Sequence, residues 1–245
     1  MSDRTVLSVT GADRESFLQG LVTNDVTKLK DGLVYAALLT AQGKFLIDFF
    51  LVPGGDAILI DVASDHAPSL FKKLTMYRLR ADVQIADTDM QVSRGTGTPP
   101  RGSYVDPRHL ALGWRGYGSE FSSDATDWDA IRVAHMVPEL GHELVPDSSY
   151  ILELDFERLN GIDFRKGCYV GQEINARMKH KTELRKGLAR VSLSAPTPSG
   201  TEITAGGKSI GTVHTQSGDH ALAYLRFDRA KGEMQAGIAT VIRVE

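Results

Sequence analysis

The densest group of residues that could do chemistry lies between Phe164 and Arg177. This segment holds the single cysteine of the chain, Cys168, together with two glycines and several charged and amide side chains. Glycine lowers helix stability and clustered polar groups do not pack in a core, so an ordinary helix or strand does not explain this composition. The residues alone leave two interpretations open: a glycine-rich turn that leads into a solvated helix, or a loop that binds a ligand.

The ligand-binding interpretation assigns a role to each residue type. Gly167 and Gly171 would let a ligand approach the backbone, and Lys166 and Arg177 would contact an anion. A lysine beside Cys168 would also make the thiol more reactive. A cysteine hydrolase would use such a thiol, and the chain has seven histidines that could act as a base. None of them stands in a recognised catalytic signature, so this hypothesis has little support.

Composition and motifs exclude several other function classes. One cysteine cannot form an internal disulfide or a cysteine metal cage, and His142-Glu143 lacks a second ligand at helical spacing, so we expect no stable metal centre. Gly95-Thr96-Gly97 does not continue as a dinucleotide or phosphate-binding motif. The net charge of −3, from 28 basic and 31 acidic residues, argues against direct binding of nucleic acid.

The sequence also predicts where the protein resides. Its longest apolar stretches, such as 46–52, are too short and interrupted to cross a bilayer, so no membrane partner is expected. The first residues show neither a secretory signal nor an Arg- and Ser-rich transit peptide. We therefore expect a cytoplasmic protein, in which Cys168 would be a free thiol.

The elements that must position these residues fall into two regions. In the first, apolar runs separated by Gly-containing turns predict an antiparallel meander, and periodic segments predict helices. The expected strands are 6–9, 33–40, 44–52 and 57–62, and the expected helices are 13–22, 65–79 and 127–137. From residue 188 onward, β-type runs at 188–193, 210–214, 221–227 and 238–244, separated by Pro, Gly and Ser, predict a small antiparallel barrel. We expect a core over 1–183 and a barrel domain over 184–245.

One string within the dense segment is specific enough to indicate a family. Lys166-Gly167-Cys168-Tyr169-Val170-Gly171-Gln172-Glu173 resembles the signature of the YgfZ family, folate-binding proteins related to the aminomethyltransferase (T-protein) of glycine cleavage. Segments 17–26, 39–44 with Asp48-Phe49, 76–80 and 159–161 resemble other parts of the family in the same order. The resemblance covers essentially the whole chain and is weakest over 91–121.

The resemblance implies a fold and a function. The implied fold is α+β: a T-protein-like ring of interleaved α/β subdomains with antiparallel sheets, closed by a small C-terminal antiparallel β-barrel, with folate in the central hole. The implied cofactor is tetrahydrofolate or a one-carbon derivative. The implied role is assembly or repair of iron–sulfur proteins, especially [4Fe–4S] ones, through transient contacts with these client proteins. Through such enzymes the protein would affect tRNA modification indirectly.

Two carboxylates are the first candidates for the pterin. A reduced pterin presents an N–H and an amino group side by side, which a carboxylate accepts in bidentate fashion. Glu153 falls near the position of the pterin-binding glutamate in the T-protein relatives; the alternative is an exposed charge at a helix start. Asp48 lies within the apolar run 45–50, so it must find a partner, point into a cavity, or lie on a solvated face.

The remaining signature residues complete the predicted site. Lys166, Arg177 or Arg80 would pair with the carboxylates of the folate tail. Gly167, Tyr169, Gly171, Gln172 and Glu173 would form the wall of a cavity shaped for the pteridine ring. One thiolate cannot hold a cluster alone, because such centres usually need four ligands. Cys168 would instead be a temporary ligand shared with a client, a redox thiol, or the holder of an adduct beside the folate. The alternative is a small buried hydrophobe.

One departure from the relatives bears on the reaction. Aminomethyltransferases tend to carry adjacent acids in this hairpin, whereas here Ile47 precedes a lone Asp48. An aminomethyltransferase-like enzyme that uses tetrahydrofolate is therefore the second hypothesis. A scaffold that binds clients without folate is the third. Whether the protein is an enzyme at all stays open at this stage.

Overall fold

The computed structural model describes residues 3–181 and 184–244, which divide into two compact units. The N-terminal unit comprises Met1–Thr126 and Glu157–Gln172, and the barrel unit comprises Asp127–Phe156 and Glu173–Glu245. This division differs from the predicted one. The predicted boundary at residue 183 lies outside the described residues, and 127–156 groups with the barrel instead of with the core.

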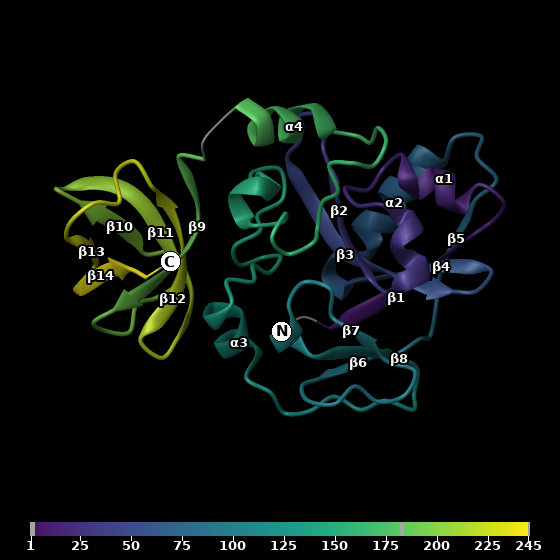
Figure 1. The fold of residues 1–245 in the computed structure, drawn as a ribbon, viewed down its shortest axis with the longest axis horizontal. Coiled ribbons are helices and arrows are strands. Elements are labelled where there is room, and N and C mark those ends of the chain that lie inside the picture. The colour runs from purple at the N-terminus through teal and green to yellow at the C-terminus, as the bar shows by residue number, and fades with distance from the viewer. Residues whose placement is uncertain (1–2, 182–183, 245) are drawn as a thin grey trace. The chain divides into compact units, whose positions relative to one another are not determined.

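An antiparallel sheet in the order β2-β3-β4-β1-β5 forms the centre of the N-terminal unit (Figure 1). Its strands are β1 (Arg4–Thr10), β2 (Val34–Leu39), β3 (Phe45–Gly54), β4 (Ala57–Ala63) and β5 (Gln84–Asp87). The predicted meander is confirmed: β3 pairs with β2 and with β4, so that Phe50 lies opposite Tyr35 on one side and Asp61 on the other. These three residues therefore share one face of the sheet.

Short helices and a second small sheet accompany the main sheet. They are α1 (Arg14–Gln19), η1 (Val26–Asp31), η2 (Ser64–His66), α2 (Ala67–Arg78), η3 (Leu110–Leu112), and the sheet β6-β8-β7, formed by β6 (Val92–Gly95), β7 (Tyr104–Val105) and β8 (Trp114–Tyr117). In α2, Leu70 and Leu74 are fully buried, as the helical spacing predicts. The predicted helix over 13–22 is shorter than expected, because it ends at Gln19 with Gly20 as its C-cap.

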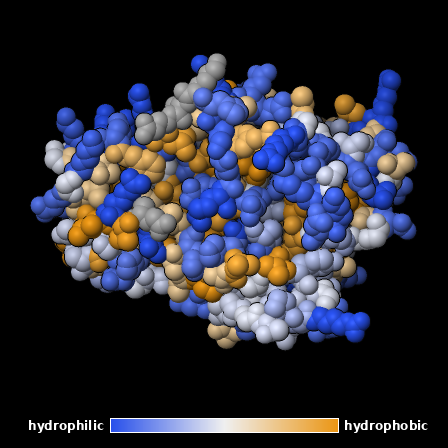
Figure 2. Space-filling view, viewed as in Figure 1, coloured by the Kyte–Doolittle hydropathy of each residue, from blue (hydrophilic) through white to orange (hydrophobic). Residues whose placement is uncertain are grey.

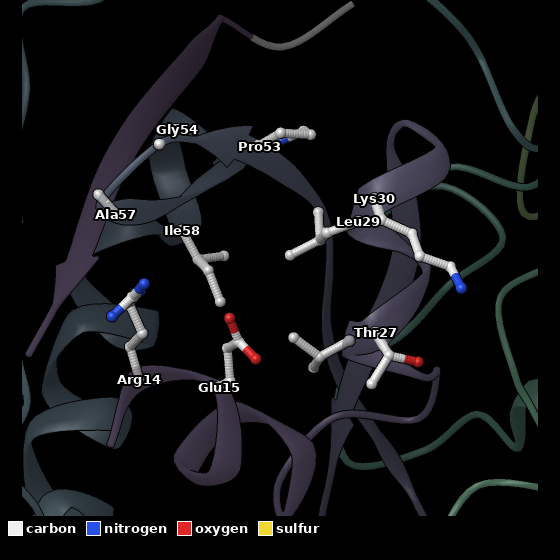
Figure 3. Close-up of a pocket in the computed structure, with 11 residues that line it drawn as sticks. Arg14, Glu15, Thr27, Leu29, Lys30, Pro53, Gly54, Ala57 and Ile58 are labelled. Atoms are coloured by element: carbon white, nitrogen blue, oxygen red, sulfur yellow. The ribbon is translucent and has the colours of Figure 1, made fainter. Parts of the chain in front are cut away.

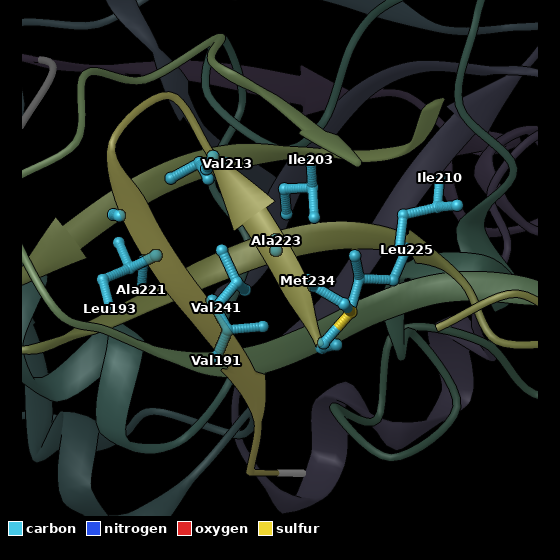
Figure 4. Close-up of a cluster of buried hydrophobic side chains, with 13 residues drawn as sticks. Val191, Leu193, Ile203, Ile210, Val213, Ala221, Ala223, Leu225, Met234 and Val241 are labelled. Carbon is cyan, nitrogen blue, oxygen red and sulfur yellow. The ribbon is translucent and has the colours of Figure 1, made fainter. Parts of the chain in front are cut away.

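The barrel unit contains the predicted antiparallel barrel, closed in the order β10-β11-β12-β9-β14-β13. Its strands are β9 (Lys186–Leu193), β10 (Glu202–Ala205), β11 (Lys208–Ser217), β12 (His220–Arg226), β13 (Met234–Ala236) and β14 (Ala239–Arg243). Alternate side chains point inward, and Val191, Val213, Leu225 and Val241 meet in its core (Figure 4). Three helices complete the unit: α3 (Trp128–Ala134), η4 (Ile151–Leu154) and α4 (Gln172–Lys181).

The surface is mixed in character. On the face that Figure 2 shows, hydrophilic residues predominate and hydrophobic ones lie scattered among them. In the described part of the chain, no helix combines the length and the apolar character needed to cross a membrane.

Candidate functional site

Most of the signature lies on a loop in the N-terminal unit, residues 164–171, which we call the thiol loop; the last two signature residues, Gln172 and Glu173, begin α4. Cys168 is exposed on this loop. Gly167 beside it is exposed as well, and a Cβ added there would meet no atom within 4 Å. The thiol is therefore accessible at the surface of its unit, and the alternative of a small buried hydrophobe is wrong.

Lys166 anchors the beginning of the thiol loop. Its Nζ donates hydrogen bonds to the carbonyl oxygens of Gln19, at 2.7 Å, and Val22, at 2.5 Å. These carbonyls lie at and just after the end of α1, where a helix leaves carbonyl groups without intrahelical partners. Burial lowers the pKa of Lys166 to about 8. Its ammonium group thus holds the loop in place, whereas the sequence predicted that it would contact an anionic ligand.

Gly171 anchors the end of the thiol loop against the turn between β2 and β3. Its φ is +82°, and a Cβ at this position would lie 2.4 Å from the carbonyl oxygen of Thr40. Both the backbone conformation and the close approach require glycine. The side-chain oxygen of Gln172 accepts a hydrogen bond from the backbone N–H of Tyr169, at 3.2 Å. Cys168 consequently lies on a loop that is fixed on either side of it.

The other signature residues lie in different surroundings. Tyr169 is buried, and the ammonium of Lys166 lies 5.0 Å from the centre of its ring. Glu173 and Arg177 are exposed on α4, in the part of this helix that belongs to the barrel unit. The segment is therefore a glycine-containing loop that leads into a charged, solvated helix, as the first interpretation predicted. Arg80, after the end of α2, is exposed as well.

Asp48 is half-buried on β3, and its side chain is hydrogen-bonded within the N-terminal unit. It accepts a hydrogen bond from the hydroxyl of Tyr35, at 2.9 Å. Burial raises the pKa of Asp48, while the positive charges of Arg4 and Arg108 oppose that rise. Asp48 therefore takes up a proton more readily than an exposed aspartate does.

A network of buried charges, which the sequence did not predict, lies on the same sheet face. Asp61 is fully buried and pairs with Arg115, at 2.9 Å, while Asp106 pairs with Arg108, at 2.8 Å, and with Arg115, at 3.2 Å. Arg115 links the two carboxylates, and its guanidinium lies 3.9 Å from the centre of the Phe50 ring. The signal that could have found Asp61 is the one used for Asp48, namely an acid within an apolar run.

Glu153 lies on η4 in the barrel unit, and its side chain is 8% exposed. The hydroxyl of Tyr224 donates a hydrogen bond to its Oε2, at 2.5 Å, and the Nζ of Lys186 lies 3.7 Å from its Oε1. The alternative of an exposed charge at a helix start is therefore wrong. Because each carboxylate oxygen has more than one lone-pair direction, Glu153 retains capacity to accept further hydrogen bonds.

Three cavities within single units offer further space for ligands. One of about 440 Å³ has an apolar floor that includes Ile58, with Arg14, Glu15 and Lys30 at its edge (Figure 3). A second, of about 360 Å³, is lined by residues that include Tyr35 and Asn160. A third, of about 210 Å³, lies in the barrel unit and is lined by residues that include Lys186, His214 and Tyr224. Cys168 lines none of the three. No metal-binding group of three or more His, Cys, Asp or Glu side chains occurs among the described residues.

Comparisons with known proteins agree on the broad relationship. Residues 185–244 match the family model of the CAF17 C-terminal beta-barrel domain. The chain is 32% identical to the mitochondrial iron–sulfur cluster assembly factor IBA57 homolog of Mycosarcoma maydis, over 77% of this chain and 55% of that protein. It is 28% identical to mitochondrial IBA57 of Mus musculus, over 96% of this chain and 78% of that protein. The chain is similar to these IBA57 proteins. It spans about half the length of the first two curated relatives that it matches.

A solved structure confirms the predicted fold class. The chain resembles the aminomethyltransferase T of the glycine cleavage system from Bartonella henselae with a TM-score of 0.76 and 14% identity, over 100% of this chain and 83% of that one. At this identity the likeness shows the fold alone. The α+β T-protein-like fold with its C-terminal barrel is thus confirmed.

The comparisons also correct one prediction. The relatives are named as mitochondrial proteins, so the predicted cytoplasmic localisation is wrong. That prediction relied on not finding a targeting segment, and such an absence is not evidence of residence in the cytoplasm.

Proposed function

We propose that this protein is a tetrahydrofolate-binding accessory factor for the assembly or repair of iron–sulfur proteins. Its clients would be [4Fe–4S] enzymes, some of which act in tRNA modification, and the relatives' names favour a mitochondrial setting. The proposal includes the finer assignment to the YgfZ family, which rests on the signature 166–173. The observation that carries the proposal is the exposed thiol of Cys168 on an anchored loop, in a chain related to IBA57 factors.

The thiol acts on a client rather than on a resident cluster. One cysteine supplies one ligand, and iron–sulfur centres usually need four, so the client must supply the others. An exposed position lets a client approach Cys168. The contacts of Lys166 and Gly171 hold the loop backbone in place on either side of the sulfur. These properties suit a temporary ligand or a redox thiol.

Glu153 is the residue that would hold the pterin. Its carboxylate would accept the ring N–H and the amino group, and such charge-assisted hydrogen bonds are stronger than neutral ones. The bound folate supplies one-carbon carrier chemistry. Asp48, hydrogen-bonded to Tyr35, would hold or move a proton in the N-terminal unit. Because Asp48 stands without the adjacent acid of the aminomethyltransferases, we favour an accessory factor over a transferase.

Titration of the purified protein with tetrahydrofolate, followed by the fluorescence of Trp114 and Trp128, tests the folate part of this proposal. We expect saturable binding, and we expect Glu153→Gln to weaken it by about tenfold or more, because a hydrogen bond to a charged group contributes about 1.5–3 kcal/mol. Glu202→Gln changes an exposed glutamate on β10 and should leave the affinity unchanged.

Two results would contradict the proposal, the first its folate part and the second its accessory role. One is a wild-type protein that does not bind tetrahydrofolate. This result would favour the third hypothesis, a scaffold that binds clients without folate. The other is formation of methylene-folate with a lipoylated aminomethyl carrier, which would establish the transferase. Separately, cells depleted of their own IBA57-related protein should regain the activity of a [4Fe–4S] enzyme when they express this chain. Unchanged enzyme activity despite soluble expression would argue against the iron–sulfur role.

A further inference from the structure

We propose that the β-barrel positions the pterin-binding carboxylate: Tyr224 on β12 and Lys186 on β9 hold Glu153 in one orientation and thereby set its preference for the pterin amino group. This inference rests on the proposed function. It gives the barrel a part in ligand recognition, although neither barrel residue need touch the ligand.

The backbone of η4 lies directly against the barrel at a glycine. A Cβ at Gly187 would lie 2.8 Å from the carbonyl oxygen of Glu153 and 3.3 Å from the ring of Phe227. A side chain at this position would push η4 away from β9. Gly187 therefore permits the close approach that brings the Glu153 side chain within reach of β9 and β12.

Two side chains from neighbouring strands then hold the two oxygens of Glu153. Tyr224 donates to Oε2 at 2.5 Å, and the ammonium of Lys186 lies 3.7 Å from Oε1 and 5.4 Å from the centre of the Tyr224 ring. Strands β12 and β9 pair with Tyr224 opposite Leu188, so the two partners are fixed by the same ladder. Contacts to both oxygens restrict the rotation of the carboxylate plane, which bidentate recognition requires.

Tyr224 is suited to this task over the whole useful pH range. Burial and the neighbouring Glu153 carboxylate raise the pKa of Tyr224 well above its ordinary value. The hydroxyl consequently stays protonated and remains a donor. A ligand that reaches Glu153 meets a carboxylate whose orientation is already set, so less conformational entropy is lost on binding.

The test measures selectivity for the amino group, which a general loss of structure would not alter. Wild-type protein and variants are titrated with tetrahydrofolate and with an analogue whose 2-amino group is replaced by methyl. We expect Tyr224→Phe and Lys186→Met each to weaken tetrahydrofolate binding by about three- to tenfold and to leave analogue binding unchanged. Lys186→Arg should retain most of the selectivity. Lys208→Met, which changes an exposed lysine on β11, should have no effect.

Each outcome separates this inference from the proposed function. If Tyr224→Phe and Lys186→Met weaken both ligands equally, the two residues only maintain structure and the inference is wrong. If neither variant changes selectivity while Glu153→Gln abolishes it, the inference fails and folate binding by Glu153 stands. If Glu153→Gln itself has no effect on tetrahydrofolate, the folate proposal fails and the inference fails with it.

Discussion

The two glycines next to Cys168 have different tasks, although they look alike in the sequence. Gly171 has a positive φ and lies where a Cβ would come within 2.4 Å of a backbone oxygen, so it is needed to seat the thiol loop on the β2–β3 turn. Gly167 has open space around it. A ligand could therefore approach the backbone at Gly167, as predicted. At Gly171 the β2–β3 turn already occupies the corresponding space.

Replacing each glycine by alanine separates these tasks. Gly171→Ala should lower the free energy of unfolding by about 1–3 kcal/mol, because it combines backbone strain with a clash against Thr40. Gly167→Ala should change it by less than about 0.5 kcal/mol, as a surface substitution without contacts does. Urea denaturation measures both values. Equal effects of the two substitutions would show that the loop is not seated through Gly171.

At the residue scale, the sequence indicated some site residues and missed others. An acid inside an apolar run marks Asp48, because a buried charge needs a partner. The partners of Asp48, Asp61 and Asp106 did not follow from this pattern. Tyr35 lies opposite Phe50 in the sheet register, and Arg108 and Arg115 come from 91–121, where the family resemblance is weakest. Pairing between residues that are far apart in the sequence depends on the fold, and no local periodicity in the sequence reports it.

Among the elements of the N-terminal unit, a buried charge network ties β8 to the main sheet. Arg115 on β8 pairs with Asp61 on β4, and also with Asp106, which lies in the connection between β7 and η3. Arg108 and Arg115 together lower the pKa of Asp106 from 3.8 to about 2. A carboxyl whose pKa is lower in the folded state stabilises the protein above its unfolded pKa, and that contribution is lost as the pH falls.

This network predicts a specific pH dependence. Asp106→Asn should reduce the free energy of unfolding by about 2 kcal/mol or more at neutral pH, because it also removes the carboxylate partner of Arg108 and one of the two carboxylates that pair with Arg115. The difference from wild type should shrink as the pH falls from about 4 to about 2. Denaturant unfolding at a series of pH values measures it, with the exposed Asp89→Asn as control. A difference that does not vary with pH would contradict this account of Asp106.

The elements themselves were largely predictable, since hydrophobic periodicity reports them directly. The meander and most barrel strands follow from apolar runs between turn residues. Strands β10 and β13 were not recognised individually, because runs as short as Glu202–Ala205 and Met234–Ala236 carry too little pattern. The helix predicted over 127–137 is the shorter α3 (Trp128–Ala134), and the carboxylate of its N-cap residue Asp127 accepts a hydrogen bond from the backbone N–H of Ala130, at 3.0 Å.

Over the whole molecule, the chain passes between its units at 126–127, 156–157 and 172–173. The thiol loop ends immediately before the last of these crossings, and Glu153 lies shortly before the second. Sequence patterns could not show this interleaving, since they report neighbours along the chain. The family resemblance predicted interleaved subdomains, and the structural neighbour confirms the fold. The assignment of 127–156 to the barrel unit required the structure.

The central claim is that the exposed thiol of Cys168 performs the work of this protein on iron–sulfur clients. The most direct measurement is the activity of a [4Fe–4S] enzyme in cells that lack their own IBA57-related protein and express this chain or a variant. We expect wild type and Gly167→Ala to restore the activity, and Cys168→Ala to restore none of it although its circular dichroism spectrum and melting temperature match those of wild type. Full restoration by Cys168→Ala would contradict a chemical role for the thiol.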